Sequence, residues 1–298
     1  MNGLTPEAQV RKDLDRLLPL LNAGLTARFE QGEAVRVGEA IRYSLEAGGK
    51  RVRPILCLLA AESVGASSEM ALSGALALEY LHTYSLIHDD LPAMDDDDLR
   101  RGKPTCHVAF GEAHAILAGD GLQAEAFAVL ASDASIPADA RVEAIALLAE
   151  ASGWRGMVGG QALDLEGEGV EAFGLDHLKT IHRLKTGALL QVSLEMGAVL
   201  GGAKNAFREA LRNAGAALGL AFQIQDDILD ATSDVATLGK RAGKDAGKGK
   251  ITYPALLGLD GARQALAEAT EIALCHLQFL PRPASLEAWA RYLAARRV

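Results

Sequence analysis

Two clusters of aspartates are the residues of this sequence best suited to chemistry, and the second cluster has the clearer spacing. It contains Asp226, Asp227 and Asp230. Four residues of an α-helix advance about 400°, so Asp226 and Asp230 lie within about 40° of each other. Carboxylates this close repel one another unless a cation neutralises them. The flanking residues are largely apolar, so we favour a cation site over the alternative, an ordinary acidic helix surface.

The first cluster begins with Asp89 and Asp90 and continues with the aspartates from Asp95 to Asp98. Asp89 and Asp95 are six residues apart and point to different sides of an ideal helix. Pro92 disfavours an ideal helix at this point, so we expect a local distortion that brings the two residues together. For this cluster taken alone, the alternative is an acidic loop with helix-capping aspartates.

Two such clusters in one chain favour a magnesium site. Mg²⁺ prefers a few carboxylates, several waters and the oxygens of substrate phosphates. Two facing helices that carry carboxylates are suited to hold several Mg²⁺ ions around one pyrophosphate group. Ions held in this way neutralise a leaving group, so that its carbon–oxygen bond can break.

Basic residues lie near these clusters and suit the same ligand. The stretch from Gly48 to Arg53 is a glycine-hinged basic patch. Arginine offers a planar fork to phosphate oxygens, and lysine offers a mobile point charge. Any one of these residues is more often a surface charge, and their interest lies in flanking the aspartates and glycines. The further candidates are Arg100, Arg101, Lys185, Lys240 and Lys250.

Helical signals recur along the chain and supply the elements that must position these residues. Thr5 and Pro6 predict the start of the first helix. Further helices are expected over residues 68–89, 111–131, 138–151, 175–201 and 207–230 and from Tyr253 to the end. No alternating strand pattern and no fixed-period repeat is present. We therefore predict an all-α protein with a single domain over residues 1–298, whose longest helices surround a central cavity.

Composition narrows the function classes. The net charge of −9 and the sequence pI near 5.3 argue against a nucleic-acid-binding protein, which normally shows a basic face. The cysteines, Cys57, Cys106 and Cys275, are far apart, so neither a zinc site nor a disulfide framework is expected. No apolar run is long enough for a membrane span. We expect a reduced, cytoplasmic enzyme.

The motifs, taken together and in order, resemble the trans-isoprenyl diphosphate synthases, in particular the bacterial short-chain farnesyl diphosphate synthases, also called geranyltranstransferases. They cover about residues 48 to 254. The resemblance implies the isoprenoid synthase fold, a bundle of long antiparallel helices around a central active-site cavity. The matching segments are GGKRVR at 48–53, the first aspartate cluster with Arg100-Arg101, GGQALD at 159–164, KTG at 185–187, FQIQDDILD at 222–230 and Gly249-Lys250.

The resemblance also implies a division of labour and a homodimer. The ligands of three Mg²⁺ ions correspond here to Asp89, Asp90, Asp95, Asp226 and Asp230. The allylic pyrophosphate is expected to bind Arg100, Lys185 and Lys240. Isopentenyl diphosphate is expected to bind Lys50, Arg53, His82 and Arg101. Thr186 and Gln223 are expected beside the developing allylic cation, with Lys250 closing over substrate; Lys244 and Lys248 are alternatives for that last role.

The implied reaction is ionisation, condensation and elimination, with the chain growing from dimethylallyl to geranyl to farnesyl diphosphate. Tyr84 lies five residues before Asp89, about 7.5 Å along a helix axis. In this family an aromatic residue there tends to close the floor of the pocket, so Tyr84 favours a farnesyl product over geranylgeranyl diphosphate.

Three other functional interpretations of the sequence are less favoured. A class I terpene cyclase does not need the basic isopentenyl pocket, and a non-catalytic synthase subunit is expected to lose an aspartate cluster. A purely structural protein leaves the clustered carboxylates without a partner. The basic end of the chain, from Arg296, is open to two interpretations: a tail folded over the isopentenyl site, as the resemblance implies, or a frayed helix end.

Overall fold

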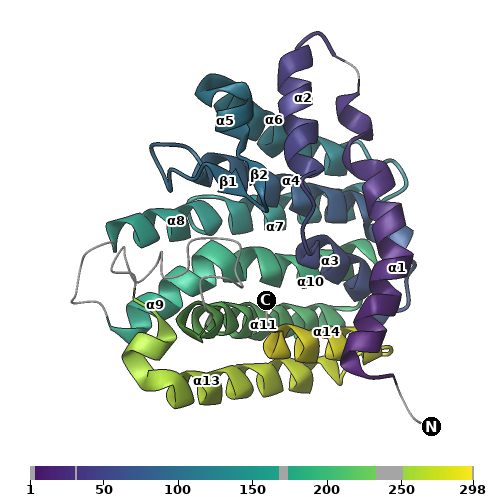
Figure 1. Ribbon diagram of the computed structural model, residues 1–298. Helices are drawn as coiled ribbons and strands as arrows, with labels where there is room; N and C mark the ends of the chain where they lie inside the picture. The colour runs from purple at the N-terminus through teal and green to yellow at the C-terminus, as the bar shows by residue number, and fades with distance from the viewer. Residues whose placement is uncertain (1–3, 31, 168–173, 233–250, 297–298) are drawn as a thin grey trace.

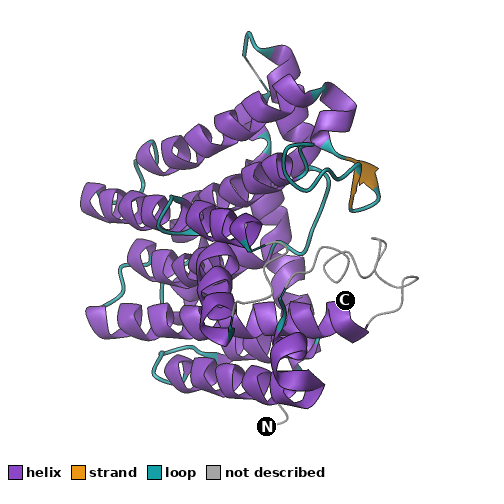
Figure 2. Cartoon of the chain, turned by 90° about the vertical axis from the view of Figure 1, so that its left-hand side faces the viewer, coloured by secondary structure: helices purple, strands orange, loops and turns teal. Residues whose placement is uncertain are grey.

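The computed structural model describes residues 4–30, 32–167, 174–232 and 251–296, and helices dominate them, as predicted. The strands described there form one short antiparallel hairpin, β1 (Leu99–Arg100) and β2 (Lys103–Pro104). Figure 1 shows the helices stacked in layers, and Figure 2 shows the hairpin at one edge. The α-helices are α1 (Pro6–Leu25), α2 (Val35–Leu45), α3 (Val52–Ser63), α4 (Leu72–Asp89), α5 (Cys106–Phe110), α6 (Glu112–Ala131), α7 (Ala138–Ser152), α8 (Met157–Glu166), α9 (Leu175–His182), α10 (Ala188–Leu200), α11 (Asn205–Thr232), α13 (Tyr253–Leu277) and α14 (Ala284–Ala295).

Local signals explain where several helices begin. The hydroxyl of Thr5 accepts a hydrogen bond from the backbone N–H of Ala8 at 3.3 Å, and Pro6 follows in the first turn of α1. Thr252 caps α13 in the same way through the N–H of Ala255 at 3.4 Å. Such caps satisfy N–H groups that have no partner within the helix.

The centre of the fold is formed by α4 and α10. Every residue of α4 from Ser73 to Leu81 is buried, and α10 is buried along most of its length. Helices that are apolar on all sides belong in the interior. Helix α4 packs against α3, α6 and α10, while α10 also packs against α11. The helices that carry the two aspartate clusters, α4 and α11, are therefore joined through the core.

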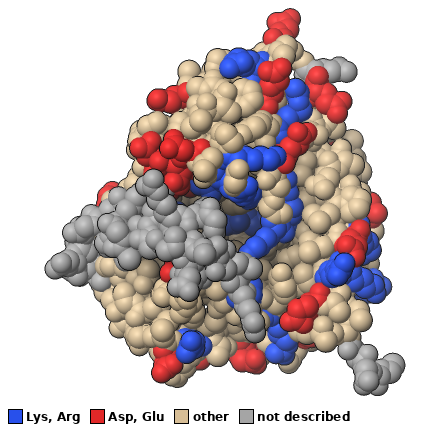
Figure 3. All heavy atoms as spheres, viewed as in Figure 1, with Lys and Arg blue, Asp and Glu red and all other residues tan. Residues whose placement is uncertain are grey.

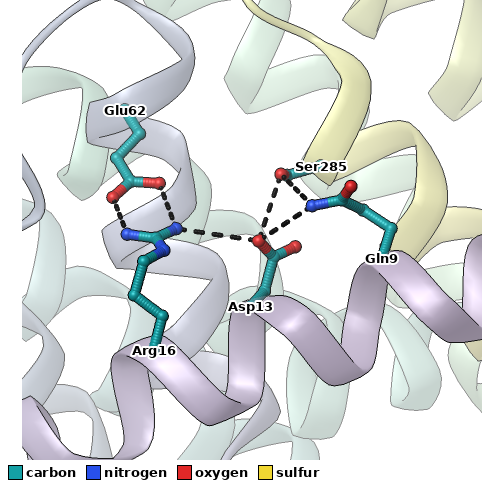
Figure 4. Close-up of polar contacts among 5 residues, drawn as sticks. All are labelled: Gln9, Asp13, Arg16, Glu62 and Ser285. Carbon is teal, nitrogen blue, oxygen red and sulfur yellow. Dashed lines mark hydrogen bonds and ion pairs between the residues drawn. The ribbon is translucent and has the colours of Figure 1, made fainter. Parts of the chain in front are cut away.

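Polar contacts fasten α1 to α3 and α14 (Figure 4). The carboxylate of Asp13 accepts hydrogen bonds from Gln9 at 3.1 Å and from Ser285 of α14 at 3.3 Å. Arg16 binds the carboxylate of Glu62 on α3. Burial raises the pKa of Asp13 above its usual value, against the opposing effect of these hydrogen bonds. These contacts hold α14 in place, and with it Arg296, the residue that follows α14.

Some elements differ from the sequence expectation. The predicted helix from Leu175 to Gly201 is interrupted by one π-helical turn, η3 (Arg183–Gly187), between α9 and α10. The helix expected from Ser68 begins with a 3₁₀ turn, η2 (Ser68–Ala71). A second 3₁₀ turn, η1 (Ala27–Phe29), follows α1. Helices α2, α3, α5 and α8 were not among the helices predicted from the sequence. None of the helices described is long and apolar enough to cross a membrane.

Candidate active site

The first aspartate cluster folds back on itself where α4 ends. The backbone N–H of Asp95 donates to the carbonyl of Asp89 at 2.8 Å, and that of Asp97 donates to the carbonyl of Asp90 at 3.2 Å. Asp89 is the last residue of α4, so the loop that contains Pro92 returns to the helix end. This is the local distortion that Pro92 predicted, and it places the backbones of Asp89 and Asp95 side by side.

The two adjacent carboxylates at the end of α4 have different surroundings. Burial raises the pKa of Asp89 to about 6, the ammonium of Lys185 opposes this rise, and the charge of Asp95 adds to it. The carboxylate of Asp90 is nearly fully buried, and both its oxygens lie 2.8 Å from Nε of Arg100. Asp89 is therefore a half-buried carboxyl whose charged form a bound metal cation would stabilise, while Asp90 has a guanidinium partner.

The basic patch forms a cluster of cations around a glycine turn. The guanidinium of Arg101, on the turn between β1 and β2, donates to the carbonyl of Gly48. Gly49 has a φ of 128°, and a Cβ there would lie 2.6 Å from the Arg101 guanidinium, so only glycine fits. Partial desolvation lowers the pKa of Lys50, Arg53 and Arg101. Cations brought together in this way favour an anionic ligand.

His82 and Arg51 adjoin this cluster but differ from its other members. Burial, followed by the charges of Arg53 and Arg101, lowers the pKa of His82 well below its usual value, so its imidazole is neutral. Arg51 is buried, and its guanidinium pairs with Glu79 of α4 and donates to the carbonyl of Leu45. Arg51 therefore holds the loop in place, and this buried pairing was not foreseen from the sequence.

Lys185 and Thr186 lie on the π-helical turn η3. A Cβ at Gly160 of α8 would lie 2.6 Å from Cα of Lys185, and a Cβ at Gly219 of α11 would lie 2.8 Å from Cα of Gly187. The backbones of α8 and α11 thus contact η3 directly, which explains why these positions are glycine. π-Helical turns are frequent at functional sites, and this one places both sequence candidates between two other helices.

A pocket opens beside this turn. Its lining includes three residues that were singled out from the sequence: Lys185, Thr186 and Gln223. Asp164 also lines the pocket and accepts a hydrogen bond from Nζ of Lys185 at 2.7 Å. Asp164 ends the GGQALD segment, yet no role for its carboxylate was predicted from the sequence.

The aspartates of the second cluster point in different directions. The carboxylate of Asp227 accepts a hydrogen bond from the backbone N–H of Tyr253 at 2.9 Å. It therefore anchors the first turn of α13, and burial raises its pKa to about 7. His182 lies 3.8 Å from Asp227 and stacks on the ring of Tyr253, with centroids 5.6 Å apart. The sequence analysis did not single out His182 as a site residue. The sequence feature that could have indicated it is its position three residues before Lys185.

Asp226 lies about 100° around α11 from Asp227 and pairs with Arg296, the residue that follows α14. The Arg296 guanidinium lies 3.8 Å from the centroid of the Phe222 ring. The backbone carbonyl of Arg296 accepts a hydrogen bond from the side chain of Gln225 at 2.6 Å. Its positive charge also lowers the pKa of Lys50. Of the two interpretations left open, the structure excludes a frayed end at Arg296, which is buried beside the basic patch.

The donor set suits magnesium better than a transition metal. On the face shown in Figure 3, Lys and Arg atoms run down the middle, next to a cluster of Asp and Glu atoms. Within the described ranges, no three His, Cys, Asp or Glu side chains converge into a ready-made metal site. Mg²⁺ is usually held by one or two carboxylates, waters and substrate phosphates, which fits the half-buried Asp89 beside Asp95. The predicted ligands Lys240 and Lys250 lie outside the described residues.

Comparisons with known proteins identify the family of the chain. Residues 35–275 match the family model of polyprenyl synthetases. The farnesyl diphosphate synthase of Geobacillus stearothermophilus is 51% identical over 91% of this chain and 92% of its own length. A chloroplastic geranylgeranyl pyrophosphate synthase of Capsicum annuum is 49% identical over 87% of this chain and 71% of its own.

A solved structure shares the fold along almost its whole length. The structure of an FPP/GFPP synthase from Zymomonas mobilis superposes with a TM-score of 0.87 at 38% identity and covers 96% of this chain and 99% of its own. The matched residues include both aspartate clusters, the basic patch and the π-helical turn. The chain therefore belongs to the polyprenyl synthetase family.

Proposed function

We propose that the protein is a prenyltransferase that condenses isopentenyl diphosphate with dimethylallyl and then geranyl diphosphate, head to tail, to give farnesyl diphosphate. Residues 1–298 form one domain in this proposal. The observation that carries it is the pocket in which Lys185 and Thr186 of η3 meet Gln223 of α11. Burial raises the pKa of the half-buried Asp89 at the end of α4 and the charge of Lys185 opposes this rise, so a bound diphosphate can contact both elements.

Cationic residues in two parts of the site are suited to bind the two different substrates. Lys185 lies beside Thr186 and Gln223 in the pocket, so it is suited to hold the allylic diphosphate next to the carbon that ionises. Lys50, Arg53 and Arg101, with neutral His82, are suited to hold the diphosphate of isopentenyl diphosphate. Thr186 and Gln223 are suited to present polar oxygens to the developing allylic cation.

Magnesium is the cofactor of this proposal, with three ions held by Asp89, Asp90, Asp95, Asp226 and Asp230. When bound, Mg²⁺ neutralises the departing diphosphate and so lowers the barrier to ionisation. Two of these carboxylates, Asp90 and Asp226, pair with Arg100 and Arg296. A metal ion bound by either carboxylate therefore shares it with an arginine, because an ionised carboxylate can accept at several sites.

Product length rests on Tyr84. Its side chain is buried on α4, five residues before Asp89. A bulky ring at this depth is suited to stop growth at fifteen carbons. Relatives named as farnesyl and as geranylgeranyl synthases are similarly close, so geranylgeranyl diphosphate is the alternative product.

The test is a product assay with radiolabelled isopentenyl diphosphate, each allylic primer in turn, and Mg²⁺ either present or chelated. Magnesium-dependent fifteen-carbon product is the expected result. A twenty-carbon product would retain the reaction and overturn the floor at Tyr84. No condensation with any primer would refute the proposal in favour of a terpene cyclase or a non-catalytic subunit.

We further propose that the protein acts as a homodimer in the cytoplasm. Apolar side chains are exposed on α5 and α6 at Val108, Ile116 and Leu117, and a second copy would cover such a face. Light scattering of the purified protein tests this: twice the chain mass of 31.3 kDa is expected, and a monomer would contradict it.

A further inference from the structure

His88 lies one helical turn after Tyr84 on α4, and the two rings are in contact. Their centroids are 5.7 Å apart and their planes meet at 83°. This is the edge-to-face arrangement that aromatic pairs prefer. Residues four apart on a helix share one face, so the imidazole covers the side of the Tyr84 ring that is nearer Asp89.

Helix α6 holds the imidazole in this orientation. Nε2 of His88 lies 3.1 Å from the carbonyl oxygen of Ile116. A carbonyl can only accept, so Nε2 is the donor. The same nitrogen lies 4.0 Å from a carboxylate oxygen of Asp120. The ring is therefore fixed at two ends, by a hydrogen bond to α6 and by Tyr84.

Gly119 of α6 provides the space that the imidazole occupies. A Cβ at this position would lie 2.5 Å from Cδ2 and 2.8 Å from Cε1 of His88. The nearest atoms to such a Cβ all belong to the His88 ring. Any side chain at position 119 must therefore displace the imidazole, while the backbones of α4 and α6 can stay in place.

We propose that His88 and Gly119 form a positioning pair that fixes the Tyr84 ring and thereby sets product length. The inference rests on the proposed function, in which Tyr84 closes the floor of the prenyl pocket. His88 restrains the ring that meets the end of the growing chain, and Gly119 makes room for that restraint. Without it the Tyr84 ring can rotate aside, so a longer chain fits.

The experiment compares the ratio of twenty-carbon to fifteen-carbon product among single and double variants. The ratio compares two products of one enzyme, so a general loss of rate does not alter it. Gly119→Ala and His88→Ala are each expected to raise the ratio about 2- to 10-fold, the factor that an edge-to-face ring contact accounts for. The double variant is expected to equal His88→Ala, because the added methyl group then meets no ring.

Gly121→Ala is the matched control on the same helix. A Cβ at Gly121 would lie 3.4 Å from Cδ1 of Ile41, far from His88, so this variant should keep the wild-type ratio. If Gly119→Ala fails to fold, His88→Ala decides alone, because it removes atoms without crowding its neighbours.

Two outcomes overturn the inference. One is an unchanged ratio in His88→Ala; if Tyr84→Ala lengthens the product in the same assay, the proposed function stands while the positioning pair is refuted. The other is a Gly119→Ala effect of equal size with and without the His88 ring. Failure of the proposed function itself is distinct, because the unmodified protein would then form neither product.

Discussion

The guanidinium of Arg296 pairs with the carboxylate of Asp226, although 70 residues separate them in the chain. The pair joins the end of α14 to the first aspartate of the second cluster on α11. Phe222 lies beneath the guanidinium, and Gln225 holds the Arg296 backbone. A metal ion that binds Asp226 must therefore compete with a cation that belongs to the protein.

Arg296→Ala is expected to lower the Mg²⁺ concentration that gives half-maximal activity by about 2- to 5-fold, because the ion pair with the partly exposed Asp226 no longer competes with the metal ion. Magnesium titration of the initial rate at saturating substrates checks this. Arg291→Ala, on the exposed side of α14, should leave the titration unchanged. An equal or higher magnesium requirement in Arg296→Ala would contradict the expected competition.

Glu79→Leu is expected to lower the free energy of unfolding by about 3–5 kcal/mol, because it leaves Arg51 buried without a carboxylate partner. Adding Arg51→Met should recover much of the loss, since the double variant buries no charge. Urea unfolding of the three variants measures both effects. A Glu79→Leu protein as stable as the wild type would show that Arg51 finds another partner.

Gly160→Ala is expected to destabilise the protein by about 1–3 kcal/mol, the usual cost of overpacking. Its new methyl group would meet the backbone of Lys185, so we also expect kcat to fall as η3 shifts. Thermal unfolding and steady-state kinetics test the two parts. Leu163→Ala, on the same helix, offers a comparison that crowds nothing at η3. Wild-type stability in Gly160→Ala would show that α8 can move away from η3 at no cost.

The stability of the protein should depend on His182 in mildly acidic solution. Burial lowers its pKa to about 4 from 6.5, so the unfolded chain takes up the proton first as the pH falls. The contribution of His182 is therefore complete above pH 6.5 and is lost between pH 6.5 and pH 4. The loss amounts to about 3 kcal/mol at this site.

The variant His182→Gln cannot take up this proton. Relative to the wild type, its free energy of unfolding should rise by about 3 kcal/mol between pH 7 and pH 4, as measured by urea unfolding at several pH values. His276→Gln, at the partly exposed end of α13, serves as the control and should follow the wild type. Parallel curves for wild type and His182→Gln would mean that His182 takes up its proton equally in both states.

The sequence determined the helices and the chemistry of the site, because both depend on local signals. Caps such as Thr5 and the spacing of apolar residues predicted where α1, α6, α7 and α11 lie, within a few residues. Pro92 predicted the break that returns Asp95 to Asp89. The unpredicted π-helical turn η3 depends instead on glycines of α8 and α11 that contact it from elsewhere in the chain.

Only the tertiary structure decided what each charged residue contacts. Asp226 and Asp227 are neighbours in a single motif, yet one pairs with Arg296 and the other anchors Tyr253. Arg51 and Arg53 belong to one short motif, yet of the two only Arg51 forms an ion pair with Glu79. These partners lie far away in the sequence. The local pattern therefore identifies which residues carry charge, and only long-range packing decides which of them hold helices together and which face the site.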